Sequence, residues 1–397
     1  MPFDPSASAD VNAWLLQQPH VADGGRSFVK ALALSLRARG LPLWRISLAL
    51  LAKHPEVLWR TVRWHESEGS TAVDRAHELA LEPPFRGSPV ALLVGGSAPI
   101  RERLDGPESR FPVCRELAAE GGTDYYAQGL TFSNGERSYV AWATREPGGF
   151  SDDALRALDA ISPLLAFRIE LESSYYATRS LLEVYLGRNA AQRVAAGQFR
   201  RGGGELIRAA IWFCDLRGFT SISDRTAPSK VVQILDVYFD CVAGVIAQHG
   251  GEVLKFIGDA ILAIFPAADD PRAACQSALA AAERALSALE GVNRDRPGEP
   301  ELNIGIALHL GEVMYGNIGS RERLDFTVIS SSVNETSRLE GLCKTLGTRL
   351  TLSEAFVNSI EQTDIVDLGE QDLKGVSSKR RVFTLARFRP TGREQTP

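Results

Sequence analysis

Two aspartates in the C-terminal half of the sequence are placed where β-elements are expected to end. Asp215 closes the segment I-R-A-A-I-W-F-C-D, whose alternating apolar and small residues are typical of a buried strand. Asp259 follows Gly258 between the runs E-V-L-K-F-I and A-I-L-A-I-F, and so short a connection predicts a hairpin with Asp259 at its exposed tip. A single aspartate at a strand end more often makes a turn or caps a helix. It is the pair that favours a site for a hard divalent cation.

The residues that follow Asp215 suit a phosphate group. They read L-R-G-F-T-S, in which Gly218 leads into the next helix. The first backbone N–H groups of a helix have no partner within it and can bind phosphate oxygens. We therefore expect Phe219 and Thr220 to contact a phosphorylated ligand.

Asn334 and Arg338 form a second polar pair. They are four residues apart in a segment with helical spacing, which places both on one face. An arginine fork meets phosphate oxygens in a fixed planar geometry. The alternative is that Arg338 is a solvated helix residue paired with Glu335 or Glu340.

The surrounding patterns indicate the elements that would position these side chains. A helix is predicted from about Pro228 to the double stop at Gly250 and Gly251. Its predicted inward residues are Val231, Leu235, Phe239, Val242 and Ile246. Upstream, a helical pattern from about residue 163 to 197 is broken by R-R-G-G-G-E at 200–205, because each glycine costs a helix about 1 kcal/mol. A domain is therefore expected to begin near residue 205.

Four ordered segments in this region resemble class III adenylate and guanylate cyclases. F-C-D-L-R-G-F-T-S and G-G-E-V-L-K-F-I-G-D-A-I-L-A-I-F are similar to the two metal-binding motifs of that family. The similarity continues through L-H-L-G-E-V-M-Y-G-N-I-G and F-T-V-I-S-S-S-V-N-E-T-S-R-L-E. The resemblance implies a ferredoxin-like α/β (α+β) catalytic domain that works as a homodimer, with active sites at the interface.

The resemblance also implies the roles of individual residues. Asp215, Asp259 and the backbone carbonyl of Leu216 would hold two Mg²⁺ or Mn²⁺ ions. Asn334 would orient the ribose, and Arg338 would stabilise charge on the α-phosphate. The expected reaction is conversion of ATP to 3′,5′-cyclic AMP and pyrophosphate, catalysed by an adenylate cyclase.

Base selection is implied for Lys255 and Thr327, which match the purine-selecting pair of the family. A lysine and a hydroxyl favour ATP over GTP, and a threonine at this position is similar to a bacterial subgroup that carries a hydroxyl residue there. Lys374, in D-L-K-G, matches a late basic position that could meet the triphosphate or could be a surface residue at a turn.

Two departures from the family pattern stand out. Many relatives read T-V-I-G-D-x-V-N, whereas this chain has Ser330, Ser331 and Ser332 before Val333, which removes a glycine and predicts a different loop path. Glu312 stands where some relatives carry an arginine for the triphosphate. Activity is therefore expected to be low or to depend on a signal from the N-terminal region.

Two other functions stay open. One is a cyclase for another nucleotide, GTP or a pyrimidine. The other is a nucleotide-binding regulatory module without turnover. A diguanylate cyclase is disfavoured because the signature G-G-[DE]-E-F is absent.

The N-terminal half is predicted as a helical region over 1–85, a sensor domain over 86–170 and a helical linker over 171–204, before the catalytic domain over 205–388. P-V-A-L-L-V-G-G and R-S-Y-V-A-W-A-T are predicted strands, and Ser151 a helix start. The stretch P-G-G-F-S-D-D-A-L-R-A-L-D-A-I-S-P-L-L-A-F-R-I-E-L resembles the closing strand-turn-helix of a GAF-type sensor domain. The resemblance implies an unknown small-molecule or protein regulator, although a structural or dimerising module is an alternative.

Composition limits the remaining possibilities. The chain has 397 residues, 44% of them hydrophobic, and a net charge of −5, which argues against nucleic-acid partners. No signal peptide and no uninterrupted apolar run long enough to span a membrane are evident, so a cytoplasmic location is expected. The five scattered cysteines are interpreted as reduced core residues, His54 and His65 as structural residues, and 389–397 as a disordered tail.

Overall fold

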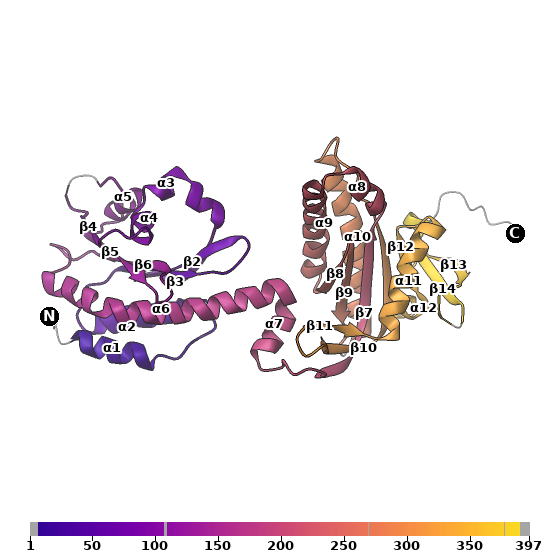
Figure 1. The fold of residues 1–397 in the computed structure, drawn as a ribbon, viewed down its shortest axis with the longest axis horizontal. Helices are drawn as coiled ribbons and strands as arrows, with labels where there is room; N and C mark the ends of the chain where they lie inside the picture. The colour runs from indigo at the N-terminus through magenta and orange to yellow at the C-terminus, as the bar shows by residue number, and fades with distance from the viewer. Residues whose placement is uncertain (1–6, 107–108, 269, 377, 390–397) are drawn as a thin grey trace. The chain divides into compact units, whose positions relative to one another are not determined.

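The computed structural model of the protein describes residues 7–106, 109–268, 270–376 and 378–389 (Figure 1). The chain divides into two compact units, Met1–Val184 and Tyr185–Pro397. Apart from Arg389, the predicted disordered tail lies outside the described residues. The predicted linker 171–204 is split between the units, because the boundary falls after Val184.

The first unit is built on a six-stranded sheet in the order β3-β2-β1-β6-β5-β4, in which every pair of neighbours is antiparallel. The strands are β1 (Arg45–Leu51), β2 (Val57–His65), β3 (Gly69–Ala76), β4 (Ile100–Arg103), β5 (Asp124–Thr131) and β6 (Arg137–Thr144). The helical elements are α1 (Ala7–Gln17), α2 (Arg26–Ala38), η1 (His77–Leu81), α3 (Pro83–Arg86), α4 (Pro89–Val94), α5 (Pro112–Ala119) and α6 (Asp152–Leu186).

Both faces of this sheet are covered. Ile46, Leu48 and Leu50 alternate along β1 toward a core shared with α1, α2 and α6. Ala49 of β1 and Trp59 of β2 point to the opposite face, into a core shared with α4 and α5 (Figure 1). The unit is therefore a sheet between two helical layers.

Two predictions for this unit are wrong. Residues 45–76 form three strands rather than helices, because the apolar residues of β1 also repeat every second position and β2 is rich in β-branched and aromatic residues. The segment P-V-A-L-L-V forms helix α4 rather than a strand. Ser88 caps α4 by accepting a hydrogen bond from the backbone N–H of Ala91 at 3.2 Å, and Pro89 occupies the first turn.

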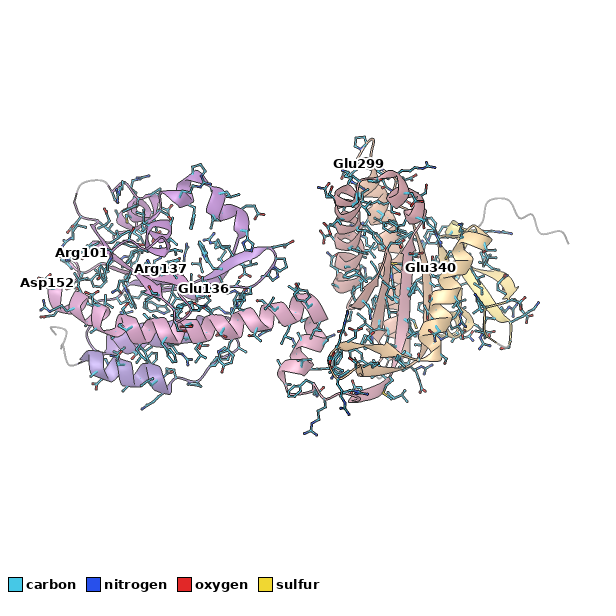
Figure 2. The ribbon with its side chains drawn as sticks, viewed as in Figure 1. Arg101, Glu136, Arg137, Asp152, Glu299 and Glu340 are labelled. Atoms are coloured by element: carbon cyan, nitrogen blue, oxygen red, sulfur yellow. The ribbon has the colours of Figure 1, made fainter. Side chains whose placement is uncertain are left out.

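The start of α6 was predicted correctly. Ser151 accepts a hydrogen bond from the backbone N–H of Ala154 at 3.2 Å. Arg101 holds the preceding turn, because it donates to the buried Asp124 and to the carbonyl of Phe150, both at 2.8 Å, and lies 4.0 Å from Asp152 (Figure 2). The predicted helical segment is interrupted at Gly187, and α7 (Arg188–Ala195) follows.

The second unit contains a larger sheet with the path β13-β14-β12-β10-β7-β9-β8, and β11 pairs with β10 off this path. Its strands are β7 (Gly204–Leu216), β8 (Glu252–Ile257), β9 (Ala260–Pro266), β10 (Ile304–Gly319), β11 (Leu324–Ile329), β12 (Leu350–Ser353), β13 (Ile365–Gln371) and β14 (Arg380–Leu385). Its other helices are α8 (Phe219–Arg225), α9 (Pro228–Gln248), α10 (Pro271–Arg294), α11 (Ser331–Leu346), α12 (Glu354–Val357) and η2 (Ala386–Phe388).

The predicted ferredoxin-like order is present in this unit. The elements β7, α9, β8, β9, α10 and β10 run β-α-β-β-α-β, and the corresponding strands lie in the order β10-β7-β9-β8. Helices α9 and α10 pack on a core that contains Trp212 and Phe265. The predicted strand before Asp215, the hairpin and the helix from Pro228 are confirmed.

Helix α9 differs from prediction in two respects. Ile234 and Tyr238 are fully buried, whereas Leu235 and Phe239 are only partly buried. By length and composition α9 could also cross a membrane, which the search for uninterrupted apolar runs missed. Its buried residues pack in the core of the second unit, as in the helix of a globular domain.

Four of the five cysteines are buried, as predicted for core residues, whereas Cys241 is only half-buried, and all five are free. His54 Nδ1 accepts from the backbone N–H of Glu56 at 3.1 Å, and His65 Nδ1 lies 2.9 Å from the hydroxyl of Ser67. Each ring therefore stabilises a local turn.

Candidate active site

The structure brings Asp215 and Asp259 together. Asp215 is next to last in β7, which pairs with β9, and Asp259 lies on the two-residue turn between β8 and β9. Gly258 has a φ of 66°, as the first residue of a tight hairpin turn requires. Burial, a hydrogen bond to the Asp259 side chain and the negative charge of Asp259 together raise the pKa of Asp215 to about 6. The two carboxyl groups are thus in direct contact.

This pair fits a magnesium or manganese site. No group of three or more His, Cys, Asp or Glu side chains that could hold a metal occurs in the described part of the chain. Magnesium is commonly held by one or two carboxylates together with substrate phosphates and water, so two aspartates suffice. The Leu216 side chain is buried, so only its main chain could contribute to such a site.

Asn334 and Arg338 lie on α11, as predicted. Asn334 is exposed and Arg338 is half-buried, and neither side chain makes a hydrogen bond or ion pair with any other described residue. The predicted alternative partners of Arg338 are engaged elsewhere. Glu335 accepts from Arg380 at 3.1 Å, and Glu340 pairs with Arg217 at 2.7 Å. The Arg338 guanidinium is therefore available to a ligand.

Gly375, the residue after Lys374, lies next to the Arg338 side chain. A Cβ placed on Gly375 would lie 3.4 Å from Nη2 of Arg338. Lys374 itself is exposed, in the turn between β13 and β14. The two cations thus approach the same region of the surface.

Lys255 and Thr327 are also close in space. Lys255 on β8 donates to Asp325 on β11 at 2.5 Å. Thr327 is two residues further along β11, so its side chain lies on the same face of the strand as that of Asp325. The proposed base-selecting pair therefore shares one patch of surface.

Phe219 and Thr220 begin α8, directly after the left-handed residue Gly218, whose φ is 74°. Phe219 packs against the core of the unit, and Thr220 is exposed. The side chain of Phe219 thus positions the turn, and the main chain is the part that could meet a ligand.

Within one chain, two groups of predicted site residues are separate: the carboxylate pair Asp215 and Asp259, and the α11 residues Asn334 and Arg338. Glu340 lies on α11 beside β7 (Figure 2), and the negative charges of Asp215 and Asp259 contribute to raising the pKa of its carboxyl group. Arg338 is two residues earlier on the same helix, and residues two apart on a helix do not share a face. Arg338 is therefore turned away from the carboxylate pair of its own chain.

Residues 205–387 match the family model described as adenylate and guanylate cyclase catalytic domain. These residues are a class III cyclase catalytic domain. An adenylate cyclase of Anabaena cylindrica is 38% identical over 165 residues, which cover 40% of this chain and 32% of the relative. Adenylate cyclase 1 of Rhizobium meliloti (strain 1021) is 36% identical over 176 residues, which cover 43% and 26%. The chain thus spans about a third or less of these relatives.

Solved structures show the same fold for the cyclase domain. A bacterial light-regulated adenylyl cyclase covers 67% of this chain and 87% of its own, with a TM-score of 0.51 and 19% identity. At 19% identity this similarity concerns the fold alone.

One ion pair beside the candidate site was not predicted from the sequence. Arg217 Nη2 lies 2.7 Å from Glu340 Oε1, directly over Gly305 of β10. Burial raises the pKa of Glu340 to about 7, the positive charge of Arg217 opposes this rise, and the charges of Asp215 and Asp259 add to it. Arg217 in L-R-G and Glu340 in S-R-L-E both lie within the motifs, but no short sequence pattern predicts that they pair.

The triple serine has a simple structural role in the cyclase domain. Ser330 is the N-cap of α11 and accepts from the backbone N–H of Val333 at 3.2 Å. Its φ is −173°, an extended conformation open to any residue. The structure therefore shows no need for glycine before Asn334 in this chain.

Proposed function

We propose that this protein is an adenylate cyclase that converts ATP to 3′,5′-cyclic AMP and pyrophosphate in a homodimer. The observation that carries the proposal is the contact between Asp215 and Asp259 at the end of β7. When bound, two divalent cations would lower the pKa of the ribose 3′-hydroxyl and neutralise charge on the triphosphate. Asp215 and Asp259 would hold them, assisted by the carbonyl of Leu216.

The remaining groups bind and orient the nucleotide. The Arg338 guanidinium has no partner among the described residues, so it can stabilise charge that develops on the α-phosphate. Asn334, one turn earlier on the same face, would orient the ribose. Lys374 would add positive charge at the triphosphate.

A second copy of the chain is needed to complete each site. Arg338 is turned away from its own carboxylate pair, so it would act on the nucleotide held by the partner's pair. Large apolar side chains are exposed beside Lys255 and Thr327: Phe256 and Ile257 are each 48% exposed, and Ile329 is 56% exposed. Such a surface supports association of two copies.

ATP is favoured over GTP by Lys255 and Thr327. A lysine and a hydroxyl can satisfy the ring acceptor and the exocyclic amine of adenine. The names of the Anabaena and Rhizobium relatives agree with this choice. We further propose that the first unit is a GAF-like sensor that regulates turnover, and that the protein acts in the cytoplasm.

The decisive experiment is turnover of the purified full chain with Mn²⁺ and, separately, ATP, GTP, CTP and UTP. We expect cyclic AMP as the main product. Another cyclic nucleotide as the main product would support the altered-substrate alternative. Nucleotide and metal binding without release of pyrophosphate would support the regulatory module without turnover.

A further inference from the structure

The first unit contains a cavity of about 310 Å³, lined by one face of its sheet and by residues of η1 and α3–α5. Figure 1 shows where α3, α4 and α5 lie in this unit. The size is at the lower end of the range for sites that enclose small molecules, about 300–1,000 Å³. Alternate residues of neighbouring strands form its floor, among them Ser47 of β1, Thr61 of β2 and Tyr139 of β6. The cavity is thus built into the sheet and does not depend on a single loop.

Three arginines line this cavity: Arg45, Arg63 and Arg75. None of their side chains makes a hydrogen bond or ion pair with another residue of the described chain. All three are half-buried, and the Nε atom of Arg63 is fully buried without a hydrogen-bond partner. Buried polar groups are normally hydrogen-bonded, so an unpartnered guanidinium in a cavity points to a missing acceptor.

The register of the sheet brings two of these cations together. Ser47 of β1 lies opposite Arg63 of β2, so Arg45, two residues before Ser47, is diagonal to Arg63 on the same face. Burial and the positive charge of Arg63 lower the pKa of Arg45. The carboxylates around the cavity are exposed: Glu82 and Glu116 line it, and Glu116 and Glu120 act on Arg45. These carboxylates leave the arginines unpaired.

The rest of the wall is apolar and aromatic. Trp59 and Phe85 pack with ring centroids 5.2 Å apart, beside Arg75, which pairs with Trp59 across β2 and β3. Leu79, Val113 and Leu117 complete the apolar side. A ligand with a flat apolar body and one anionic group would satisfy both parts of this wall.

We propose that this cavity binds a small organic anion, an aromatic carboxylate or phosphate, whose charged group is held by Arg45, Arg63 and Arg75. The ring of the ligand would lie against Trp59 and Phe85. The cavity would then be the ligand site of the first unit. Binding can be measured without any turnover, so its test is independent of the cyclase proposal.

Isothermal titration calorimetry on the full chain tests this with four aromatic anions: benzoate, 2-naphthoate, indole-3-acetate and phenyl phosphate. Benzamide, 2-naphthamide and indole-3-acetamide are the neutral controls. We expect at least one anion to bind once per chain, at least about 10-fold more tightly than its neutral counterpart, which is the scale of one charge-assisted hydrogen bond. No binding by any anion, or equal binding by the amide, would overturn the proposal.

Variants locate the site. Arg63→Gln and Arg45→Gln should each weaken binding about 10-fold. Arg60→Gln is the matched control, because Arg60 lies on β2 outside the cavity and is bonded to Asp74 at 2.7 Å. Because unpartnered like charges oppose folding, the cavity variants should unfold at the same or a higher temperature without ligand. Unchanged affinity in Arg45→Gln, Arg63→Gln and Arg75→Gln would place the anion elsewhere and contradict the assignment.

Discussion

The carboxyl group of Asp215, near the end of β7, is hydrogen-bonded to that of Asp259, on the turn between β8 and β9. Two carboxylates held this close repel one another unless a proton or a cation lies between them. This contact is the geometry that the proposed cation site requires.

Asp259→Asn should therefore lower turnover of ATP with Mn²⁺ by at least about 100-fold, the scale for removing a charge that stabilises a transition state. Steady-state cyclic AMP formation measures this. Asp236→Asn is the control, because Asp236 is an exposed carboxylate on α9, and its activity should match that of the unmodified chain. Equal activity of the two variants would show that Asp259 is not part of the active site.

The same contact predicts a pH dependence of stability in the metal-free protein. The folded-state pKa of Asp215, about 6, is above the ordinary value of 3.8, so protonation of the pair favours the folded state. The resulting stabilisation is complete below about pH 4 and is lost as the pH rises through about 6. Asparagine cannot ionise, so Asp215→Asn should unfold at a higher temperature than the unmodified chain at about pH 7.5.

Thermal unfolding in the presence of a chelator, at about pH 4.5 and about pH 7.5, tests this expectation. The advantage of Asp215→Asn should be larger at the higher pH. The same measurement on Asp236→Asn controls for replacing an exposed aspartate. A pH-independent difference for Asp215→Asn would show that the pair does not hold a proton in the folded state.

The orientation of Arg338 predicts complementation between inactive chains. In a two-fold dimer with composite sites, a heterodimer of Asp259→Asn and Arg338→Ala contains one intact site. Random exchange of an equal mixture makes about half of the dimers mixed, so about a quarter of the unmodified activity should return. Cyclic AMP formation before and after mixing measures the recovery.

A matched mixture provides the control. Asp215→Asn combined with Asp259→Asn should recover no activity, because both changes fall in the same half of the site. Recovery in neither mixture would argue against sites shared between chains. Recovery in both would show that the carboxylate pair itself is assembled from two chains.

Local signals explain which parts of the site could be predicted. The strand before Asp215, the Gly258–Asp259 turn and the helix that carries Asn334 and Arg338 depend on patterns a few residues long. The pairing of Arg217 with Glu340 depends on how α11 packs beside β7, and no short pattern contains that information.

The errors have the same origin. The run P-V-A-L-L-V is as apolar as a strand. It forms a helix because Ser88 caps the helix start and Pro89 fits its first turn. On α9, the helical period fits a buried face that contains Leu235 about as well as the observed buried face that contains Ile234. Packing of α9 on the sheet decides which of the two faces is buried.

The Arg217–Glu340 pair gives a further prediction through the glycine below it. A Cβ on Gly305 would lie 1.6 Å from Nη2 of Arg217 and 2.5 Å from Oε1 of Glu340, so Gly305→Ala must displace the ion pair. Displacing the pair leaves the buried Glu340 carboxyl without its partner, which costs about 1–3 kcal/mol of unfolding free energy. Because Arg217 follows Leu216 directly, turnover should also fall.

Gly244→Ala is the matched substitution. Gly244 lies within α9, and a Cβ there would meet nothing within 4 Å, so alanine should stabilise the helix by about 0.5–1 kcal/mol. Chemical denaturation and ATP turnover of the two variants separate the effects. If Gly305→Ala were as stable and active as Gly244→Ala, the ion pair would have no part in positioning the end of β7. If Gly305→Ala lost stability but kept full turnover, the pair would serve the fold alone.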